Sequence, residues 1–441
     1  MEVGKHIERI KQRDFTVGII GLGYVGLPLI LEFSHAGFPV LGLDVDPSKI
    51  EALSKGKSYI GHIPDERIQH LAESGKFSAT TDFARCIEAD ALLICVPTPI
   101  TAHREPDLSY IVQTGRAIAP HLRDGALVVL ESTTYPTTTD EVLRAELEAN
   151  GKQAGVDFLL AYSPEREDPG NADFSTGKIP KVVGGYDAVS LEVADTLYRQ
   201  VVPTTVPVSS TRTAEAVKLT ENIFRSVNIA LVNELKLIYA KMGIDIWEVI
   251  EAAKTKPFGY MPFYPGPGLG GHCIPIDPFY LTWKAREYEV PTRFIELAGE
   301  INTSMPDYVV EQLVNALNDR EKSLKGSKIL LVGLAYKKNI GDIRESPALA
   351  LLRILSLKHA TVDYYDPHAP VIPPTREFSE FEGIESIAWD LEGLASYDAA
   401  IIVTDHDGID YAALVEHTPL VVDTRNATRG LPGAQEKVVQ A

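Results

Sequence analysis

The sequence predicts an α/β protein in which two doubly wound parallel sheets are joined by a helical region with one long helix. Three observations predict it. Apolar runs alternate with helical patterns between residues 15 and 130, a helical pattern continues without a break over 214–242, and a second set of apolar runs begins at residue 328. With 441 residues, 45% of them hydrophobic, the chain is long enough for two or three domains.

The first unit opens with four predicted strands, each a short apolar run bounded by polar or turn residues. The first strand leads into a glycine turn. A helix is expected to begin near Leu27 and Pro28, because proline suits the first turn of a helix. The alternation of strands and helices favours a parallel sheet. The predicted strands cover residues 15–20, 38–44, 91–96 and 126–130.

The segment 214–242 contains no glycine or proline and carries apolar residues at helical spacing. We expect one long helix here. Its length indicates a spine between domains and a surface for a dimer. The apolar positions are Val217, Phe224, Val227, Leu231, Leu235 and Ile238.

A second, smaller α/β unit is predicted after a linker at residues 322–327. It opens with a strand-like apolar run. Further strand-like runs follow at wide spacing. These runs cover residues 328–334, 360–365, 399–403 and 420–422.

The composition limits the classes of function. A formal net charge of −19 argues against nucleic acid as a partner, so an anionic ligand must be held by a few local Lys and Arg side chains. No apolar run reaches the roughly 18–20 residues needed to cross a bilayer, and residues 1–14 are too polar for a secretory signal. With three cysteines and no metal-binding motif, we expect a cytoplasmic protein without membrane partner, disulfide or metal.

The turn after the first strand has the spacing of a dinucleotide-binding motif. Gly21 gives a tight turn, Gly23 admits a pyrophosphate and Gly26 allows close packing of helix on strand. Asp44 closes the second strand, 44 − 26 = 18 positions further on, about where a ribose-binding acid is expected. Such an acid repels a 2′-phosphate, so NAD is preferred over NADP, and Lys49 is near enough to modify this choice. The predicted cofactor contacts here are Gly21, Gly23, Tyr24, Val25, Gly26, Asp44 and Lys49.

A glycine-rich loop at residues 265–278 places Cys273 four residues before a carboxylate, Asp277. A loop of this kind lets backbone amides come close to a ligand. Cys273 is therefore a candidate nucleophile and Asp277 a candidate partner. Cys86 and Cys95 lack such surroundings, and we expect both to be buried and inert.

Several further motifs occur in order along the chain, and together they resemble the nucleotide-sugar 6-dehydrogenases, the family of UDP-glucose dehydrogenase. The resemblance covers nearly the whole chain. Residues 163–170 and 270–281 most resemble the bacterial branch that oxidises UDP-N-acetylglucosamine. The motifs lie at 21–26, 96–99, 131–133, 163–166, 215–222, 265–278, 333–338 and 342–347.

The resemblance implies three domains. An N-terminal Rossmann-like domain over residues 1–212 binds NAD, a central helical domain over 213–321 carries the cysteine loop, and a C-terminal Rossmann-like domain over 322–441 holds the UDP end of the substrate. The family is usually dimeric or larger. Its reaction converts the C6 alcohol of a UDP-sugar to a carboxylate with two NAD per substrate, here in the service of surface polysaccharide synthesis.

The resemblance also implies roles for single residues. Cys273 attacks the C6 aldehyde to give a thiohemiacetal, which is oxidised to a thioester and hydrolysed. Lys218 and Asn222, four residues apart on one helix face, donate to the oxyanion at C6. Asp277, with Thr133, activates water, and Glu165 assists proton transfer. The role of His272 stays open.

The remaining implied contacts divide between the two ligands. Pro97, Thr98, Thr133 and Arg344 lie at NAD-binding positions of the family. The cations among the substrate contacts hold the diphosphate through charge-assisted hydrogen bonds. The implied substrate contacts are Glu165, Arg166, Lys218, Asn222, Gly268, Gly270, Gly271, Lys337 and, as a weaker candidate, Arg425.

Two departures from the UDP-glucose branch favour another sugar. Ile276 stands where that branch has lysine, and Pro169 stands where it has an acid. The same chemistry on UDP-N-acetylmannosamine or UDP-glucose remains an alternative. So do a single-step alcohol or hydroxyacid dehydrogenase, which has no need of Cys273, and a non-catalytic nucleotide-sugar sensor.

Overall fold

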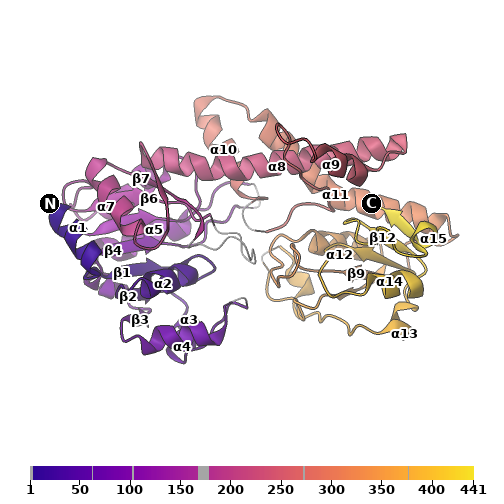
Figure 1. The fold of residues 1–441 in the computed structure, drawn as a ribbon, viewed down its shortest axis with the longest axis horizontal. Helices are drawn as coiled ribbons and strands as arrows, with labels where there is room; N and C mark the ends of the chain where they lie inside the picture. Colours follow the sequence, from indigo (N-terminus) through magenta and orange to yellow (C-terminus); the bar gives the residue numbers. More distant parts are fainter. Residues whose placement is uncertain (1–2, 62, 102–103, 167–177, 272–273, 376) are drawn as a thin grey trace. The chain divides into compact units, whose positions relative to one another are not determined.

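The structure is a computed structural model that describes residues 3–61, 63–101, 104–166, 178–271, 274–375 and 377–441. The chain forms two compact units (Figure 1). The first comprises Met1–Glu221 and Phe279–Pro291, and the second comprises Asn222–Pro278 and Thr292–Ala441. The predicted fold class, α/β with parallel sheets and a long helix, is confirmed.

The first unit is built on an eight-stranded sheet in the order β3-β2-β1-β4-β5-β6-β7-β8. The first six strands are parallel and have the strand order of a doubly wound dinucleotide-binding sheet. Strand β7 runs antiparallel to β6 and parallel to β8. The strands are β1 (Val17–Ile20), β2 (Val40–Leu43), β3 (Phe77–Thr80), β4 (Ala91–Ile94), β5 (Leu127–Leu130), β6 (Leu159–Tyr162), β7 (Lys181–Gly185) and β8 (Thr205–Val208).

Both faces of this sheet are covered, which explains why its central strands are continuous apolar runs. Along β1, Val17 and Ile19 belong to one core cluster and Ile20 to the cluster on the opposite face. Helices α2 and α7 contribute to the first cluster, and α5 contributes to the second. The helices of this unit are α1 (Val3–Gln12), α2 (Gly26–His35), α3 (Pro47–Ser54), α4 (Asp65–Glu73), η1 (Phe83–Glu88), α5 (Ser109–Ile118), η2 (Ala119–His121), η3 (Thr138–Leu143), α6 (Arg144–Glu148), α7 (Ala188–Tyr198) and η5 (Arg286–Tyr288).

The turn between β5 and η3 is held by one buried acid of the long helix. Thr137 has φ of +94°, a conformation that a β-branched residue rarely adopts. Its N–H donates to Glu215 Oε2 at 2.6 Å, and the N–H and Oγ1 of Thr139 donate to Glu215 Oε1 at 2.9 and 2.7 Å. Glu215 thereby keeps the turn in this conformation.

The second unit contains a five-stranded, all-parallel sheet in the order β10-β9-β11-β12-β13. Its strands also alternate between two core clusters, with Ile329 and Leu331 of β9 on one face and Leu330 and Val332 on the other. The strands are β9 (Lys328–Val332), β10 (Thr361–Tyr365), β11 (Ala399–Ile402), β12 (Val421–Asp423) and β13 (Val438–Gln440). The helices after β9 are α12 (Pro347–Leu357), η6 (Ser379–Phe381), α13 (Leu391–Leu394), α14 (Tyr411–His417) and α15 (Ala434–Lys437).

The predicted long helix is present as α8 (Thr211–Met242), which begins three residues before the predicted start. Three more helices follow it: α9 (Ile246–Ala253), α10 (Asp277–Ala285) and α11 (Arg293–Asn318). Within the described residues, no helix is both long and apolar enough to cross a membrane.

Candidate active site

The glycine turn between β1 and α2 is tightly packed at its first and third glycines and open at its second. Gly21 has φ of +90°, and a Cβ there would lie 2.8 Å from the Cys95 carbonyl oxygen. A Cβ on Gly26 would lie 2.0 Å from the Gly21 carbonyl oxygen, whereas a Cβ on Gly23 would meet nothing within 4 Å. The open space at Gly23, at the N-terminus of α2, fits an approaching pyrophosphate.

Asp44 lies buried directly after β2 and faces this turn. Its Oδ2 accepts from Leu22 N at 2.7 Å and from Lys49 Nζ at 2.9 Å, and its Oδ1 accepts from Asp46 N at 2.9 Å. A carboxylate offers about four acceptor positions, so these three bonds leave capacity for a ribose hydroxyl. The turn and this acid therefore fit a dinucleotide in the way the sequence predicts.

Three other predicted cofactor residues follow the carboxyl ends of β4 and β5, which are neighbouring parallel strands. Pro97 and Thr98 come after β4, and Thr133 comes after β5. The Thr98 carbonyl accepts a hydrogen bond from the Tyr280 hydroxyl. Ser132 Oγ donates to the Val96 carbonyl at 2.7 Å and so joins the two strand ends. In doubly wound sheets, ligands bind at this edge.

In the first unit, Glu165 accepts hydrogen bonds from two other predicted substrate residues. Lys218 Nζ donates to the Glu165 carbonyl at 2.6 Å, and Arg166 N donates to Glu165 Oε1 at 2.8 Å. The Arg166 guanidinium pairs with Glu221 at 2.6 Å, one helical turn beyond Lys218 on α8. Lys218 is buried, so it is held in place and is not a solvated helix lysine.

Sequence reasoning missed the buried charge pair behind this group. Lys181 Nζ lies 2.7 Å from Glu131 Oε2 and 3.3 Å from Glu165 Oε2, and the Tyr198 hydroxyl donates to Glu131 Oε1. Burial raises the pKa of Glu131. Burial opposes the charge of Lys181, but Glu131 and Glu165 outweigh it and raise the pKa of Lys181 above its usual value. Lys181 is therefore a charged group that steadies the Glu165 carboxylate.

In the second unit, two predicted catalytic residues are in direct contact. Asn222 Nδ2 donates to Asp277 Oδ2 at 2.6 Å, and Arg225 Nη2 donates to Asn222 Oδ1. Asn222 and Asp277 are both almost completely buried. These contacts fix the orientation of the Asn222 amide and, among the described residues, leave its second N–H for another acceptor.

Cys273 and His272 lie outside the described residues, so the glycine loop is described up to Gly271 and from Ile274 onward. The loop runs directly against Tyr336, next to the predicted substrate contact Lys337. A Cβ on Gly270 would lie 2.4 Å from Tyr336 Cβ, and one on Gly271 would lie 2.9 Å from the Tyr336 ring. Glycine is required at both positions by this close approach. Gly268, with φ of +138°, also needs the freedom of glycine.

Arg344 and the glycine loop share a contact. Gly271 N donates to the Arg344 carbonyl at 2.9 Å. The Arg344 guanidinium is ion-paired with Asp342, with Nη2 to Oδ2 at 2.6 Å. Its predicted contact with NAD therefore has to compete with this pair.

Arg425 lies at the other end of the glycine loop. A Cβ on Gly266 would lie 2.6 Å from Arg425 Nη1, and Gly266 N donates to Asn233 Oδ1 at 3.0 Å. Arg425 Nε donates to the Val403 carbonyl at 2.8 Å. Burial lowers the pKa of Arg425 from its usual value. One turn after Asn233 on α8, the buried Lys236 Nζ has no hydrogen-bond partner among the described residues.

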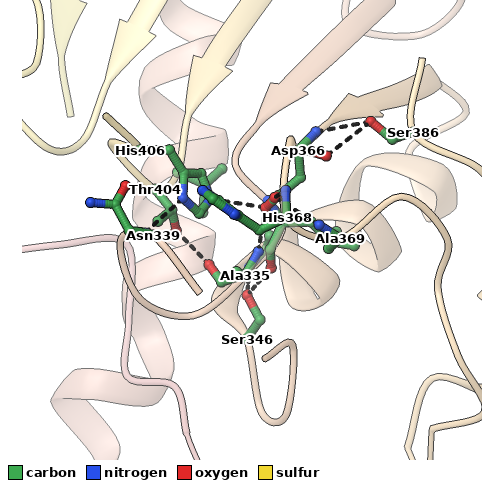
Figure 2. A network of polar contacts seen from close by, with 12 residues as sticks. Ala335, Asn339, Ser346, Asp366, His368, Ala369, Ser386, Thr404 and His406 are labelled. Carbon is green, nitrogen blue, oxygen red and sulfur yellow. Dashed lines mark hydrogen bonds and ion pairs between the residues drawn. The ribbon is translucent and has the colours of Figure 1, made fainter. Parts of the chain in front are cut away.

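The second unit has its own glycine turn and strand-end acid, but the acid is used differently (Figure 2). Gly333 has φ of +87°, as Gly21 does in the first unit. Asp366, after β10, accepts five hydrogen bonds where Asp44 accepts three. A carboxylate with five donors has no capacity left for a ribose hydroxyl. The donors to Asp366 are Leu334 N, Ala335 N, His368 N, Ala369 N and His406 Nε2.

Cys86 and Cys95 are free and buried, as predicted. Burial raises the pKa of Cys86 to about 12, and burial raises that of Cys95 well above its usual range. Neither thiol forms a thiolate readily, so neither competes with Cys273 as a nucleophile. Among the described residues, no group of three or more His, Cys, Asp or Glu side chains is arranged to hold a metal.

Two Rossmann-like units, one with an intact glycine turn and a strand-end acid, define a protein of the dinucleotide-binding class. Three domain models of the UDP-glucose/GDP-mannose dehydrogenase family match the chain: the NAD-binding domain over residues 15–202, the central domain over 212–304 and the UDP-binding domain over 330–430. The chain belongs to this family and is an NAD-dependent nucleotide-sugar dehydrogenase.

Relatives with different sugar substrates are about equally similar. A UDP-N-acetyl-D-glucosamine 6-dehydrogenase of Pseudomonas aeruginosa is 36% identical over 396 residues, 89% of this chain and 91% of the relative. A UDP-N-acetyl-D-mannosamine dehydrogenase of Escherichia coli is 36% identical over 407 residues, 89% of this chain and 93% of the relative. The solved structure of a UDP-D-ManNAc dehydrogenase from Pyrococcus horikoshii has a TM-score of 0.86 and 31% identity, covering 96% of this chain and 98% of that one.

Proposed function

We propose that this protein oxidises the C6 alcohol of UDP-N-acetylglucosamine to the carboxylate, in two successive oxidations at one active site. The observation that carries the proposal is the contact between Asn222 and Asp277. Two buried polar side chains, 55 positions apart, meet at 2.6 Å, and one of them, Asp277, lies four residues after the candidate nucleophile Cys273. Buried polar groups oriented in this way suit charge stabilisation and proton transfer during a reaction.

The cofactor is held by the turn at Gly21–Gly26 and by Asp44, which fit it in packing and in acceptor capacity. NAD supplies the hydride acceptor. The protein's own contribution is to bind and orient the sugar C6 and to move protons. In this scheme Glu165 takes the proton of the C6 hydroxyl. Lys218 and the second N–H of Asn222 donate to the oxygen on which negative charge develops.

Cys273 makes the second oxidation possible. Its thiolate sulfur adds to the C6 aldehyde, and the carbonyl oxygen takes up a proton, giving a thiohemiacetal. NAD would supply the acceptor for the C6 hydride and Glu165 would take that proton, which gives a thioester. Asp277, with Thr133, directs water to the thioester carbon, which releases the carboxylate and returns the thiol. Covalent capture keeps the reactive aldehyde on the enzyme.

The choice of sugar rests on the branch of the family that the loop sequences resemble. The segments 163–170 and 270–281 carry that resemblance, and Ile276 and Pro169 depart from the UDP-glucose branch. UDP-N-acetylmannosamine is the closest alternative, because relatives that use it are as similar as those that use UDP-N-acetylglucosamine.

A stripe of exposed apolar side chains supports the expectation of a homodimer or larger assembly. Phe224, Leu231 and Ile238 of α8 are 48%, 49% and 47% exposed. They are seven residues apart, so they share one face of the helix. Large apolar side chains in such a row suit contact with a second copy of the chain.

One assay tests the reaction and the sugar together. Purified protein is incubated with NAD and, separately, UDP-N-acetylglucosamine, UDP-N-acetylmannosamine and UDP-glucose, and NADH is counted per sugar consumed. We expect two NADH per UDP-N-acetylglucosamine and slower turnover of the other sugars. One NADH per sugar contradicts the double oxidation. No NADH with any sugar favours a nucleotide-sugar sensor.

The nucleophile is tested by Cys273→Ser. We expect steady turnover to fall by at least about 10³-fold, because serine is a far weaker nucleophile at neutral pH, while NAD binding measured by fluorescence is retained. Cys86→Ser is the matched control and is expected to keep full activity. Normal kcat in Cys273→Ser removes this cysteine from the mechanism.

A further inference from the structure

The loop that carries Lys337 is fixed at its start by buried hydrogen bonds (Figure 2). Leu334 N and Ala335 N donate to Asp366 Oδ2 at 2.6 and 2.8 Å. Thr404 Oγ1 donates to the Ala335 carbonyl at 2.6 Å. These bonds tie the first residues of the loop to the strand ends of β10 and β11.

The same loop is fixed at its other end through Asn339. Its N–H donates to His406 Nδ1 at 2.9 Å, and its side chain exchanges two hydrogen bonds with Asp407, at 2.6 and 2.9 Å. Asn339 has φ of +62°, in the left-handed region. Contacts from outside the loop therefore keep its backbone in this conformation. Lys338 adds an ion pair with Asp407 at 2.7 Å.

His406 connects the two ends of the loop that carries Lys337. It is completely buried, and its Nε2 lies 3.0 Å from Asp366 Oδ2, the oxygen that also accepts from the start of the loop. Since Nδ1 accepts the Asn339 N–H, Nδ1 carries no proton. The ring is therefore the neutral tautomer with its proton on Nε2, which donates to Asp366. One imidazole thus joins the acid at the start of the loop to the main chain at its end.

We propose that His406 is a positioning residue for substrate binding: it fixes the span 336–338 between two anchored ends, so that Lys337 meets the UDP part of the substrate in one geometry. The proposal rests on the proposed function, in which Lys337 contacts the UDP-sugar. His406 itself touches no substrate in this account. Its effect is transmitted through the Asn339 N–H.

Three substitutions separate this role from simple core packing. His406→Ala removes both ring contacts. His406→Asn places an amide oxygen near the position of Nδ1 and keeps an acceptor for Asn339. His406→Gln reaches the position of Nε2 and keeps a donor for Asp366, but offers nothing to Asn339.

We expect the Kd of UDP, measured by calorimetry, and the KM of the nucleotide sugar to rise about tenfold in His406→Ala and His406→Gln. Both values return to within about threefold of wild type in His406→Asn. The KM of NAD and kcat change less than about twofold in all three variants, because the NAD turn belongs to the other unit. A purely structural role predicts equal losses for the asparagine and glutamine variants.

His368→Ala is the matched control. Its ring lies 4.9 Å from the His406 ring and is exposed, and it contributes its backbone N–H, not its side chain, to Asp366. This variant keeps the UDP affinity of wild type.

Unchanged UDP affinity in folded His406→Ala overturns the proposal, as does rescue by glutamine and not by asparagine. Failure of all three variants to fold also overturns it, since His406 is then a structural residue only. If wild-type protein binds UDP but oxidises no nucleotide sugar, the proposed function fails, and the UDP measurements still decide the role of His406.

Discussion

At the scale of single residues, Asp44 and Asp366 show that a strand-end acid is defined by the donors around it. Each lies directly after the second strand of its sheet, next to a glycine turn that follows the first strand. Asp44 accepts three hydrogen bonds and Asp366 accepts five. The first can still accept from a ribose hydroxyl, and the second serves the fold of its own loop.

Side-chain roles were predictable from the sequence where the partners are close along the chain. The spacing from Gly26 to Asp44 is local, so it could be read directly. The pairs Glu131–Lys181 and Asp366–His406 join residues 50 and 40 positions apart, so no local sequence pattern predicts them. The meeting of Asn222 with Asp277 is equally non-local, and only family resemblance suggested that both residues matter.

Lys236 gives a pH-dependent prediction at this scale. Burial lowers the pKa of Lys236 to about 7, and repulsion from the Arg425 guanidinium is the second cause. Between about pH 7 and 10.4 the unfolded chain therefore binds more protons at this group than the folded protein, and the contribution of Lys236 to the free energy of unfolding rises with pH. Lys236→Met is expected to raise the free energy of unfolding by about 1–4 kcal/mol at pH 6, and by much less at pH 9.

Urea unfolding of wild type and Lys236→Met at these two pH values makes the comparison. Lys241→Met, at an exposed position of the same helix, is the control and should show no such pH dependence. If Lys236→Met raised the free energy of unfolding equally at both pH values, burial of the Lys236 charge would not be what destabilises the protein.

At the scale of elements, eight strands of the structure correspond to predicted apolar runs. Seven of them lie within the predicted run, and β12 is shifted from it by one residue. Most strands with both faces buried were predictable because they are continuous apolar runs, but β6 was not predicted although it is apolar and buried along its whole length. Others were not predicted for identifiable reasons: β3 and β8 are part-exposed, β7 ends in two glycines, and β13 has three residues. The antiparallel step from β6 to β7 depends on a chain path that no local pattern encodes.

The glycine turn yields a matched pair of variants. Gly26→Ala places a Cβ 2.0 Å from the Gly21 carbonyl oxygen, so the turn must move, and we expect a loss of about 1–3 kcal/mol in the free energy of unfolding. Gly23→Ala meets nothing within 4 Å and is expected to fold as wild type does, but to bind NAD at least tenfold more weakly, because the methyl group fills the space for the pyrophosphate.

Thermal unfolding and NAD titration of both variants distinguish the two effects. Wild-type NAD affinity in Gly23→Ala would show that the pyrophosphate does not approach this glycine. Wild-type stability in Gly26→Ala would contradict the close packing of α2 on β1.

At the scale of the whole molecule, the class of fold was predictable from the sequence and the family resemblance was confirmed, since both depend on the order of elements and motifs. The sugar was not predictable from residues alone, because recognition of an acetamido group depends on the shape of a pocket. A net charge of −19 on a protein with two anionic ligands means that binding depends on a few placed cations.

Self-association is testable on the exposed stripe of α8. We expect wild-type protein to sediment as a dimer or larger, and Leu231→Asp to sediment as a smaller species, because a carboxylate in an apolar contact is strongly unfavourable. Leu357→Asp is the control, since Leu357 is also exposed, on α12. A wild-type protein that sediments as a monomer contradicts the assignment of this stripe.

The strained turn at Thr137 has a thermodynamic consequence for ligand binding. Glu215 holds the backbone between β5 and η3 in one conformation through three hydrogen bonds, and Thr133 lies four residues before the strained position. A segment that is already ordered loses little conformational entropy when a ligand arrives. In Glu215→Ala the turn would no longer be held in one conformation before the ligand binds. Ordering it on binding would then cost conformational entropy, and the measured entropy of NAD binding would be less favourable.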